Sequence, residues 1–122
     1  MPTITLIPQA GFGTVVRTLR IGPYNVAIQK DLGVQNGPVH YEYVLAGIDR
    51  RIKKITFFIT SERNTGAVGG SHILCMFIND HHVNFGVSDD WADLDNFEAA
   101  ALKLIEGVIA RDKHHPPYDA GV

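Results

Sequence analysis

The main feature of this sequence is an alternation of apolar and polar residues with a period of two. It is clearest over residues 39–48, where Val39, Tyr41, Tyr43 and Leu45 fall on one face of an extended chain. Successive side chains of a β-strand point to opposite sides of a sheet, so this pattern predicts a strand with one face in the core. The same pattern, interrupted by glycine, proline and asparagine turn signals, predicts seven strands. They cover residues 3–7, 14–21, 24–29, 39–48, 52–60, 72–78 and 83–87.

The period changes near the C-terminus, where one long amphipathic helix is predicted from Asp93 to Arg111. Asp95 and Glu98, three residues apart, resemble a capping box, and acidic side chains in a first turn suit the positive end of the helix dipole. Apolar residues then recur at helical spacing and form a single broad stripe. The stripe consists of Phe97, Ala101, Leu104, Ile105 and Val108.

A run of strands followed by one helix is typical of the α+β class. We predict a curved antiparallel β-meander, or a partly open barrel of about seven strands, with the C-terminal helix packed on its concave or open side. A chain of 122 residues fits one domain with a single core. We place this domain at residues 1–113 and an extended tail at 114–122, because Pro116 and Pro117 cannot continue a helix.

The strand predicted at residues 72–78 is apolar on both faces, which is typical of a central strand covered on two sides. Apolar residues also fall on the second face of other strands, among them Val44 and Phe58. A single helix covers only one face of a sheet, so the other face needs barrel closure or another subunit. This favours a binding protein that holds a protein partner or a small apolar ligand, and that self-associates as a homodimer.

Composition and charge are those of an ordinary globular protein. Apolar residues make up 45% of the chain, and the net charge of −2 gives no general attraction to nucleic acid or anionic lipid. Cys75 is the single cysteine, which excludes an intrachain disulfide and a thiolate metal cluster, and we expect it to be buried. Without a signal sequence or an apolar run of roughly 20 residues, we expect a cytoplasmic protein that does not enter a membrane. No motif predicts a cofactor or a metal.

Histidines and a glutamate supply the candidate acid–base chemistry. His40 and Glu42 are two residues apart and therefore share one face of a strand, where an imidazole and a carboxylate could act as base and orienting group. His82, at the tip of a predicted hairpin, and His72 on the paired strand could join them. The resulting alternative is a small enzyme of hydrolase or lyase type with His40, Glu42 and His82 as catalytic residues. Solvated polar residues on a strand and at a turn explain the same pattern more simply.

Two charged clusters of opposite sign offer other contacts. Arg50, Arg51, Lys53 and Lys54 surround one hairpin tip and could bind an anion or RNA, although the aromatic residues nearby are assigned to the core. The approach to the helix is acidic, which is explained by helix initiation. Together the two clusters would allow a charge-matched contact between subunits. The acidic residues are Asp89, Asp90, Asp93, Asp95 and Glu98.

The sequence therefore favours a non-catalytic binding or protein-interaction module that self-associates through a sheet face or cup. Its candidate binding residues are the apolar Val44 and Phe58 and the basic hairpin tip. The acid–base enzyme is the first alternative, and anion or RNA binding by the tip is the second.

Overall fold

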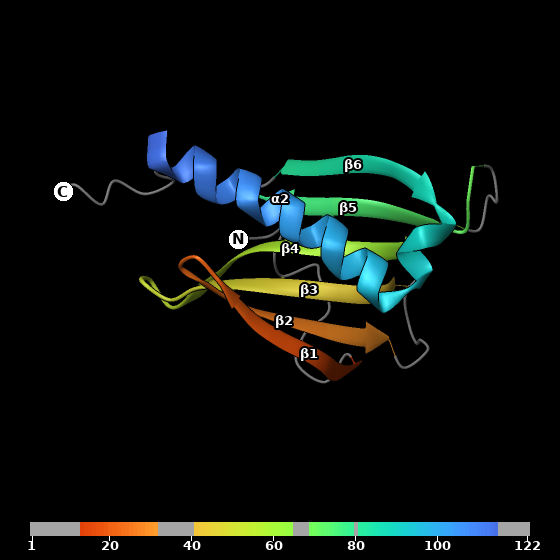
Figure 1. The fold of residues 1–122 in the computed structure, drawn as a ribbon, viewed down its shortest axis with the longest axis horizontal. Helices are drawn as coiled ribbons and strands as arrows, with labels where there is room; N and C mark the ends of the chain where they lie inside the picture. The colour runs from red at the N-terminus through yellow and green to blue at the C-terminus, as the bar shows by residue number, and fades with distance from the viewer. Residues whose placement is uncertain (1–12, 32–40, 65–68, 80, 115–122) are drawn as a thin grey trace.

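Six antiparallel strands form one sheet in which every strand pairs with its neighbours in sequence, in the order β1-β2-β3-β4-β5-β6 (Figure 1). The computed structural model describes residues 13–31, 41–64, 69–79 and 81–114. The strands are β1 (Gly13–Ile21), β2 (Tyr24–Asp31), β3 (Tyr41–Asp49), β4 (Lys54–Arg63), β5 (His72–Ile78) and β6 (His81–Ser88).

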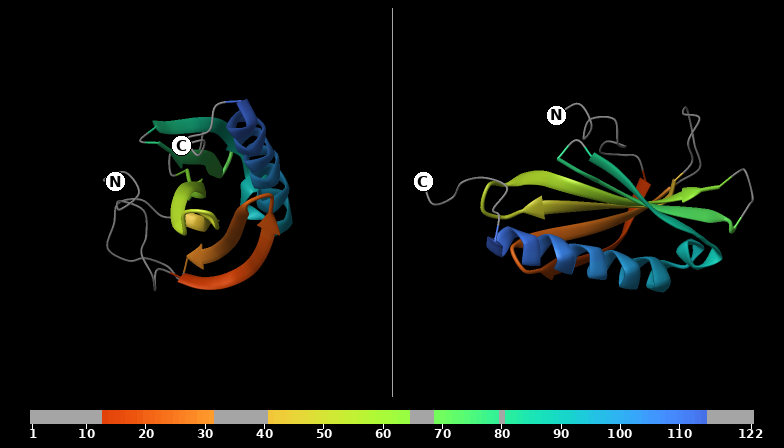
Figure 2. Two further views of the ribbon diagram at one scale, coloured as in Figure 1. Left: turned by 90° about the vertical axis from the view of Figure 1, so that its left-hand side faces the viewer. Right: turned by 90° about the horizontal axis from the view of Figure 1, so that it is seen from above.

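A short 3₁₀ helix, η1 (Asp89–Ala92), leads from β6 into the long helix α2 (Leu94–His114). Figure 2 shows the sheet curving around α2, which lies along the concave face. The Asp93 carboxylate accepts a hydrogen bond from the backbone N–H of Asn96 at 3.0 Å, and the Asp93 carbonyl accepts one from Phe97. Asp93 is therefore the N-cap of α2. The N-cap thus lies two residues before the predicted one, and the prediction of a capping box at Asp95 and Glu98 is wrong. Those two carboxylates bind Arg17 instead.

The main core lies between α2 and the concave face of the sheet. Phe97, Ala101 and Ile105 of the predicted helical stripe are fully buried there. Tyr43 stacks on Phe97 with 5.4 Å between ring centroids, and Tyr24 packs edge-on against Phe57 at 5.0 Å. Each large apolar side chain buried in this way contributes roughly 2 kcal/mol before conformational entropy is counted. The sheet contributes Tyr24, Val26, Ile28, Tyr43, Leu45, Phe57, Ile59, Leu74 and Met76.

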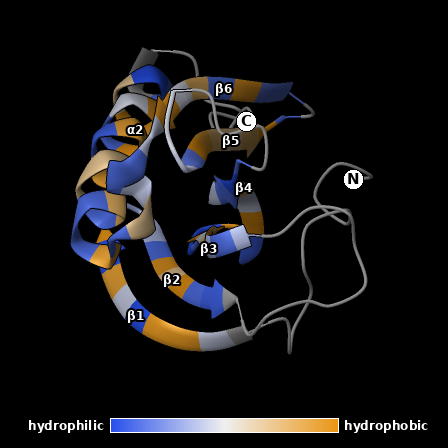
Figure 3. Cartoon of the chain, turned by 90° about the vertical axis from the view of Figure 1, so that its right-hand side faces the viewer, coloured by the Kyte–Doolittle hydropathy of each residue, from blue (hydrophilic) through white to orange (hydrophobic). Residues whose placement is uncertain are grey.

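The convex face of the sheet carries a second, smaller apolar cluster. Val44 and Phe58 are 2% and 4% exposed, and Tyr41, Ala46 and Phe77 pack against them. Figure 3 shows apolar residues, coloured orange, along the strands of the sheet. No helix or strand among the described residues lies over this convex face. On β5, Leu74 and Met76 are buried on one face and Cys75 on the other, so the prediction that the strand at residues 72–78 is covered on two sides is confirmed.

Cys75 belongs to the convex face and is 1% exposed, as the sequence predicts. Burial raises the pKa of its thiol to about 11, so the group is protonated near neutral pH and is a poor nucleophile. Cys75 therefore acts as a small apolar residue in the centre of the sheet.

The α+β class and the curved antiparallel meander closed by one helix are confirmed. The described chain holds six strands, where the sequence predicts about seven. The strand predicted at residues 3–7 lies outside the described residues, as do residues 115–122 of the predicted tail. None of the described helices has the length and apolar character needed to span a bilayer.

Gly107 occupies an exposed position on the outer side of α2, where an added β-carbon would meet no atom within 4 Å. Glycine is less favourable than alanine inside a helix by about 1 kcal/mol. We expect Gly107→Ala to raise the free energy of unfolding by about 0.5–1 kcal/mol in urea denaturation. Ala99→Gly, at another exposed position of α2, is the reciprocal control and should lower it by a similar amount. A destabilised Gly107→Ala variant would contradict this assignment and indicate a backbone packed against this side of the helix.

Candidate functional site

A polar cluster centred on Glu42 lies at one end of the concave face. The Glu42 carboxylate accepts hydrogen bonds from Lys30 Nζ at 3.0 Å and from Arg63 Nε at 3.1 Å, and it lies 3.3 Å from His72 Nε2. The side chains of Glu42 and His72 are 15% and 9% exposed, so water is largely excluded from this contact. The cluster joins four strands, β2, β3, β4 and β5, through one carboxylate.

A β-bulge directs Glu42 into this cluster. The pairing of β3 with β4 shifts between Tyr41 and Tyr43, so Glu42 is the extra residue. Tyr41 packs with the convex cluster, whereas Tyr43 packs in the main core. The regular alternation predicted for residues 39–48 therefore fails at Glu42. As a result its carboxylate meets Arg63 and His72, which are paired with each other across β4 and β5.

Ser71 extends the cluster to the surface. Its hydroxyl lies 2.7 Å from His72 Nδ1, while the other ring nitrogen of His72 faces Glu42. The Ser71 backbone N–H donates to the Asp89 carboxylate at 2.8 Å, which fixes the start of β5 against η1. The order serine, histidine, glutamate is one in which a proton could pass from hydroxyl to imidazole, with the carboxylate stabilising the cation.

The electrostatics of Glu42 keep its carboxylate ionised near neutral pH. Burial tends to raise the pKa of Glu42, but hydrogen bonds from Lys30 and His72 and the charge of Arg63 outweigh it, so the pKa is lowered. An ionised carboxylate can orient His72 and stabilise its cation, although it is itself a weak base. The cluster therefore holds two cations and a histidine around one carboxylate.

The predicted catalytic residues reach different parts of the molecule. Glu42 meets His72 as the acid–base alternative requires. His82 is exposed on β6 and stacks on Phe77 of the convex cluster, with ring centroids 4.4 Å apart and ring planes within 8°. His40 lies outside the described residues. Among the residues that the structure describes, no three His, Cys, Asp or Glu side chains gather as a metal site would require.

The basic hairpin tip is partly used in internal contacts. Arg50 donates to the carbonyls of Gly22 and Pro23, at 2.5 and 3.3 Å, and so holds the β3–β4 tip against the β1–β2 turn. Arg51 binds the fully buried Asp49 carboxylate through two nitrogens, at 3.0 and 2.8 Å. Lys53 and Lys54 are exposed. In this predicted binding cluster, the side chains of Lys53 and Lys54 make no hydrogen bond or ion pair with the residues that the structure describes.

The acidic approach to α2 also has structural partners. Arg17 of β1 bridges Asp95 at 3.0 Å and Glu98 at 2.5 Å. Asp93 caps the helix and Asp89 holds Ser71, as described above. The interpretation of this cluster as helix initiation is therefore supported, with the addition that it ties the edge strand β1 to the helix.

Exposed apolar residues occur on several strands, and three of them lie on β6, at the other edge of the sheet. All residues of β6 are exposed or half-buried, and Val83, Phe85 and Val87 are 40%, 42% and 37% exposed. Among the described strands, β6 pairs only with β5, so its outer side has no described partner. Among the described strands, β6 carries three large exposed apolar side chains, whereas β1 carries two, Val15 and Val16.

Comparison with known proteins gives no further guide. No family model matches the chain, and neither the curated proteins nor the solved structures contain a match.

Three residues of the polar cluster were not singled out from the sequence. Lys30, Arg63 and Ser71 meet Glu42 and His72 through strand pairing, and their separation along the chain gives no periodic signal. The pair Tyr41 and Tyr43 gave no warning of the bulge, because regular alternation places both residues on one face.

Proposed function

We propose that the protein is a non-catalytic interaction module that self-associates by pairing β6 with β6 of a second copy. The observation that carries this proposal is the open, apolar and uncharged character of β6. The strand has the sequence HHVNFGVS and contains no lysine, arginine, aspartate or glutamate. An edge strand presents unpaired N–H and C=O groups, which makes it a template for another strand.

The opposite edge of the sheet supports the proposal by contrast. Natural edge strands are protected by charged side chains and bulges. β1 carries Arg17 and Arg20 and has a bulge between Val15 and Arg17, and Arg17 also anchors it to α2. β6 has a bulge near Gly86, whose φ is +113°, but the segment before this bulge has no charged residue of these four types. The unprotected edge is therefore β6.

A second copy fits this edge because antiparallel strands are related by a twofold axis. Two β6 strands pairing in this way would bring Val83 and Phe85 of each copy together, and would extend the sheet across both subunits. The exposed apolar area of both strands would then be removed from water. The earlier prediction of self-association through a sheet face changes accordingly, since Val44 and Phe58 are nearly inaccessible and the exposed apolar residues lie at the edge.

Light scattering of the purified protein and of a Phe85→Lys variant tests this function. We expect the wild-type chain to reach twice the mass of one chain as concentration rises, and Phe85→Lys to weaken the association about tenfold or more. Val15→Lys on β1 is the matched control, because Val15 is also an exposed apolar residue of an edge strand. It should associate like the wild type.

Two results would contradict the proposal. The first is a wild-type chain that stays monomeric at the highest concentration it tolerates. The second is equal dissociation by Phe85→Lys and Val15→Lys, which would move the contact away from β6.

A further inference from the structure

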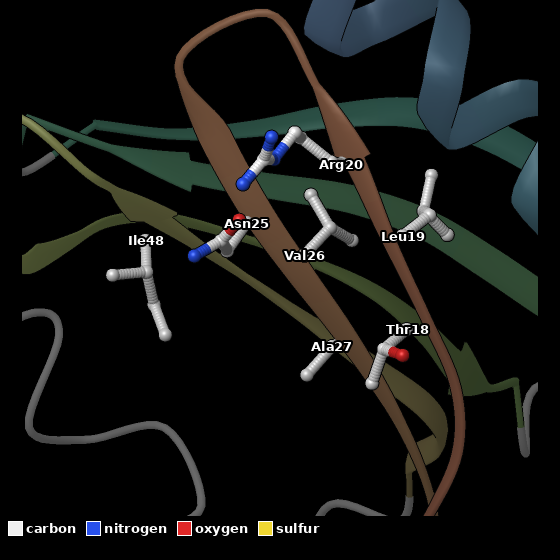
Figure 4. Close-up of a pocket in the computed structure, with 7 residues that line it drawn as sticks. All are labelled: Thr18, Leu19, Arg20, Asn25, Val26, Ala27 and Ile48. Carbon is white, nitrogen blue, oxygen red and sulfur yellow. The ribbon is translucent and has the colours of Figure 1, made fainter.

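The β1–β2 hairpin carries a hollow (Figure 4), and none of the residues that line it belongs to the polar cluster or to β6. Its volume is about 440 Å³, and it is a shallow recess that is open to solvent on one side. Thr18, Arg20, Asn25, Ala27 and Ile48 line it through their side chains. The β1 edge and the β6 edge lie at opposite ends of the strand order, so a ligand here would not compete with pairing along β6.

Strand register explains why this part of the sheet is hollowed. Arg20, Asn25 and Ile48 form one row across β1, β2 and β3, and Thr18 lies opposite Ala27 in the next row. Alternate residues of these strands point to the same side, so all five side chains belong to the convex face. Ala27 is the smallest of them, and the longer side chains around it leave space above its methyl group.

Two polar side chains of the hollow, those of Arg20 and Asn25, are available to a ligand. In the part of the chain that the structure describes, the side chains of Arg20 and Asn25 make no hydrogen bond or ion pair, and both are exposed. In Figure 4 they extend from neighbouring strands on the same side of the hairpin. A guanidinium and an amide in this position can both donate to an anion.

The surrounding charge favours an anion as well. Arg50 lies against the turn that joins β1 to β2, and the exposed Lys53 and Lys54 follow in the same hairpin tip. The carboxylate nearest along β3 is that of Asp49, which is fully buried and bound to Arg51. The hollow therefore lies in a region where positive charge exceeds exposed negative charge.

We propose that this hollow binds a small organic acid, with its carboxylate on Arg20 and Asn25 and its apolar body over Ala27 and Ile48. The planar guanidinium can donate two parallel hydrogen bonds to a carboxylate, which gives both orientation and affinity. One arginine inside the hollow matches one negative charge better than the two charges of a phosphate monoester. Because the hollow is open to solvent, the affinity belongs in the millimolar range.

Titration of the ¹⁵N-labelled protein with sodium benzoate, followed by NMR, tests this site. We expect saturable shifts of the Arg20 Nε–H, of the Asn25 side-chain amide and of the backbone N–H groups of Thr18 and Ala27. Benzyl alcohol, which has the same ring without the charge, should bind at least about tenfold more weakly. Inorganic phosphate distinguishes a specific carboxylate site from a general anion effect and should give smaller shifts at the same groups.

Variants of the lining residues complete the test. Arg20→Gln should weaken benzoate binding about tenfold while leaving the rest of the spectrum unchanged, since the Arg20 side chain makes no hydrogen bond or ion pair with the described residues. Ala27→Leu should abolish binding by filling the hollow, and Lys53→Gln, a cation outside the lining, should bind within about twofold of the wild type. No saturable shift with benzoate, or equal binding of benzyl alcohol, or equal binding by Arg20→Gln, would overturn the proposal.

Discussion

Replacing Gly47 with alanine is expected to lower the free energy of unfolding by about 3 kcal/mol. Gly47 is a buried residue of β3, and the ring of Phe57 lies directly over it from the paired strand β4. An added β-carbon would be 2.6 Å from Phe57 Cε2 and closer still to Cζ and Cε1. Phe57 is fully buried and packs against Tyr24, so its ring cannot move aside without disturbing the core.

Urea denaturation of Gly47→Ala measures this effect, and Gly107→Ala is its matched control because the same substitution there is expected to stabilise. The double variant Gly47→Ala with Phe57→Leu should cost less than the sum of the two single changes, since the smaller side chain leaves room for the methyl group. Wild-type stability in Gly47→Ala would show that the Phe57 ring does not occupy the space above Gly47.

The order of elements was predictable because it depends on local periodicity. Each strand of the meander pairs with the next in sequence, so the period-two segments and the turn signals between them were sufficient to predict the topology. The helical stripe was predictable for the same reason, and Phe97, Ala101 and Ile105 are its buried members. The exact position of the N-cap was harder to predict, because Asp93 and Asp95 lie two residues apart and each has a carboxylate that can cap a helix.

The site could not be predicted to the same degree, because register between strands is not encoded by any one segment. The bulge at Glu42 decides that its carboxylate faces Arg63 and His72. The hollow depends on Arg20, Asn25 and Ile48 coming into one row across three strands. Neither arrangement leaves a spacing that can be recognised in the sequence.

The two apolar surfaces of the sheet have different consequences for function. The convex cluster around Val44 and Phe58 is already removed from solvent, so it contributes to stability. The exposed valines and phenylalanine of β6 are accessible and therefore available for a partner. A sequence pattern reports only that a side chain is apolar, which is why the sequence predicted Val44 and Phe58 as binding residues and did not single out the exposed residues of β6.

Replacing Glu42 with glutamine is expected to destabilise the fold by about 2 kcal/mol at neutral pH, since Lys30 and Arg63 would lose a partly buried anionic partner. The pKa of Glu42 is lowered in the folded protein, so its ionised form stabilises the fold above its unfolded pKa. This contribution is retained above the ordinary glutamate value of 4.5 and is lost as the pH falls through the lowered folded pKa.

Urea unfolding of the wild type and of Glu42→Gln between neutral pH and pH values below 4.5 measures this linkage. The difference in unfolding free energy should be largest near neutrality and should shrink in acid, where the wild-type carboxylate is also uncharged. Glu106→Gln, at an exposed position of α2, is the control and should change stability by less than about 0.5 kcal/mol throughout. A difference that does not vary with pH would mean that the charge of Glu42 contributes nothing, and that the polar cluster is held by side-chain packing alone.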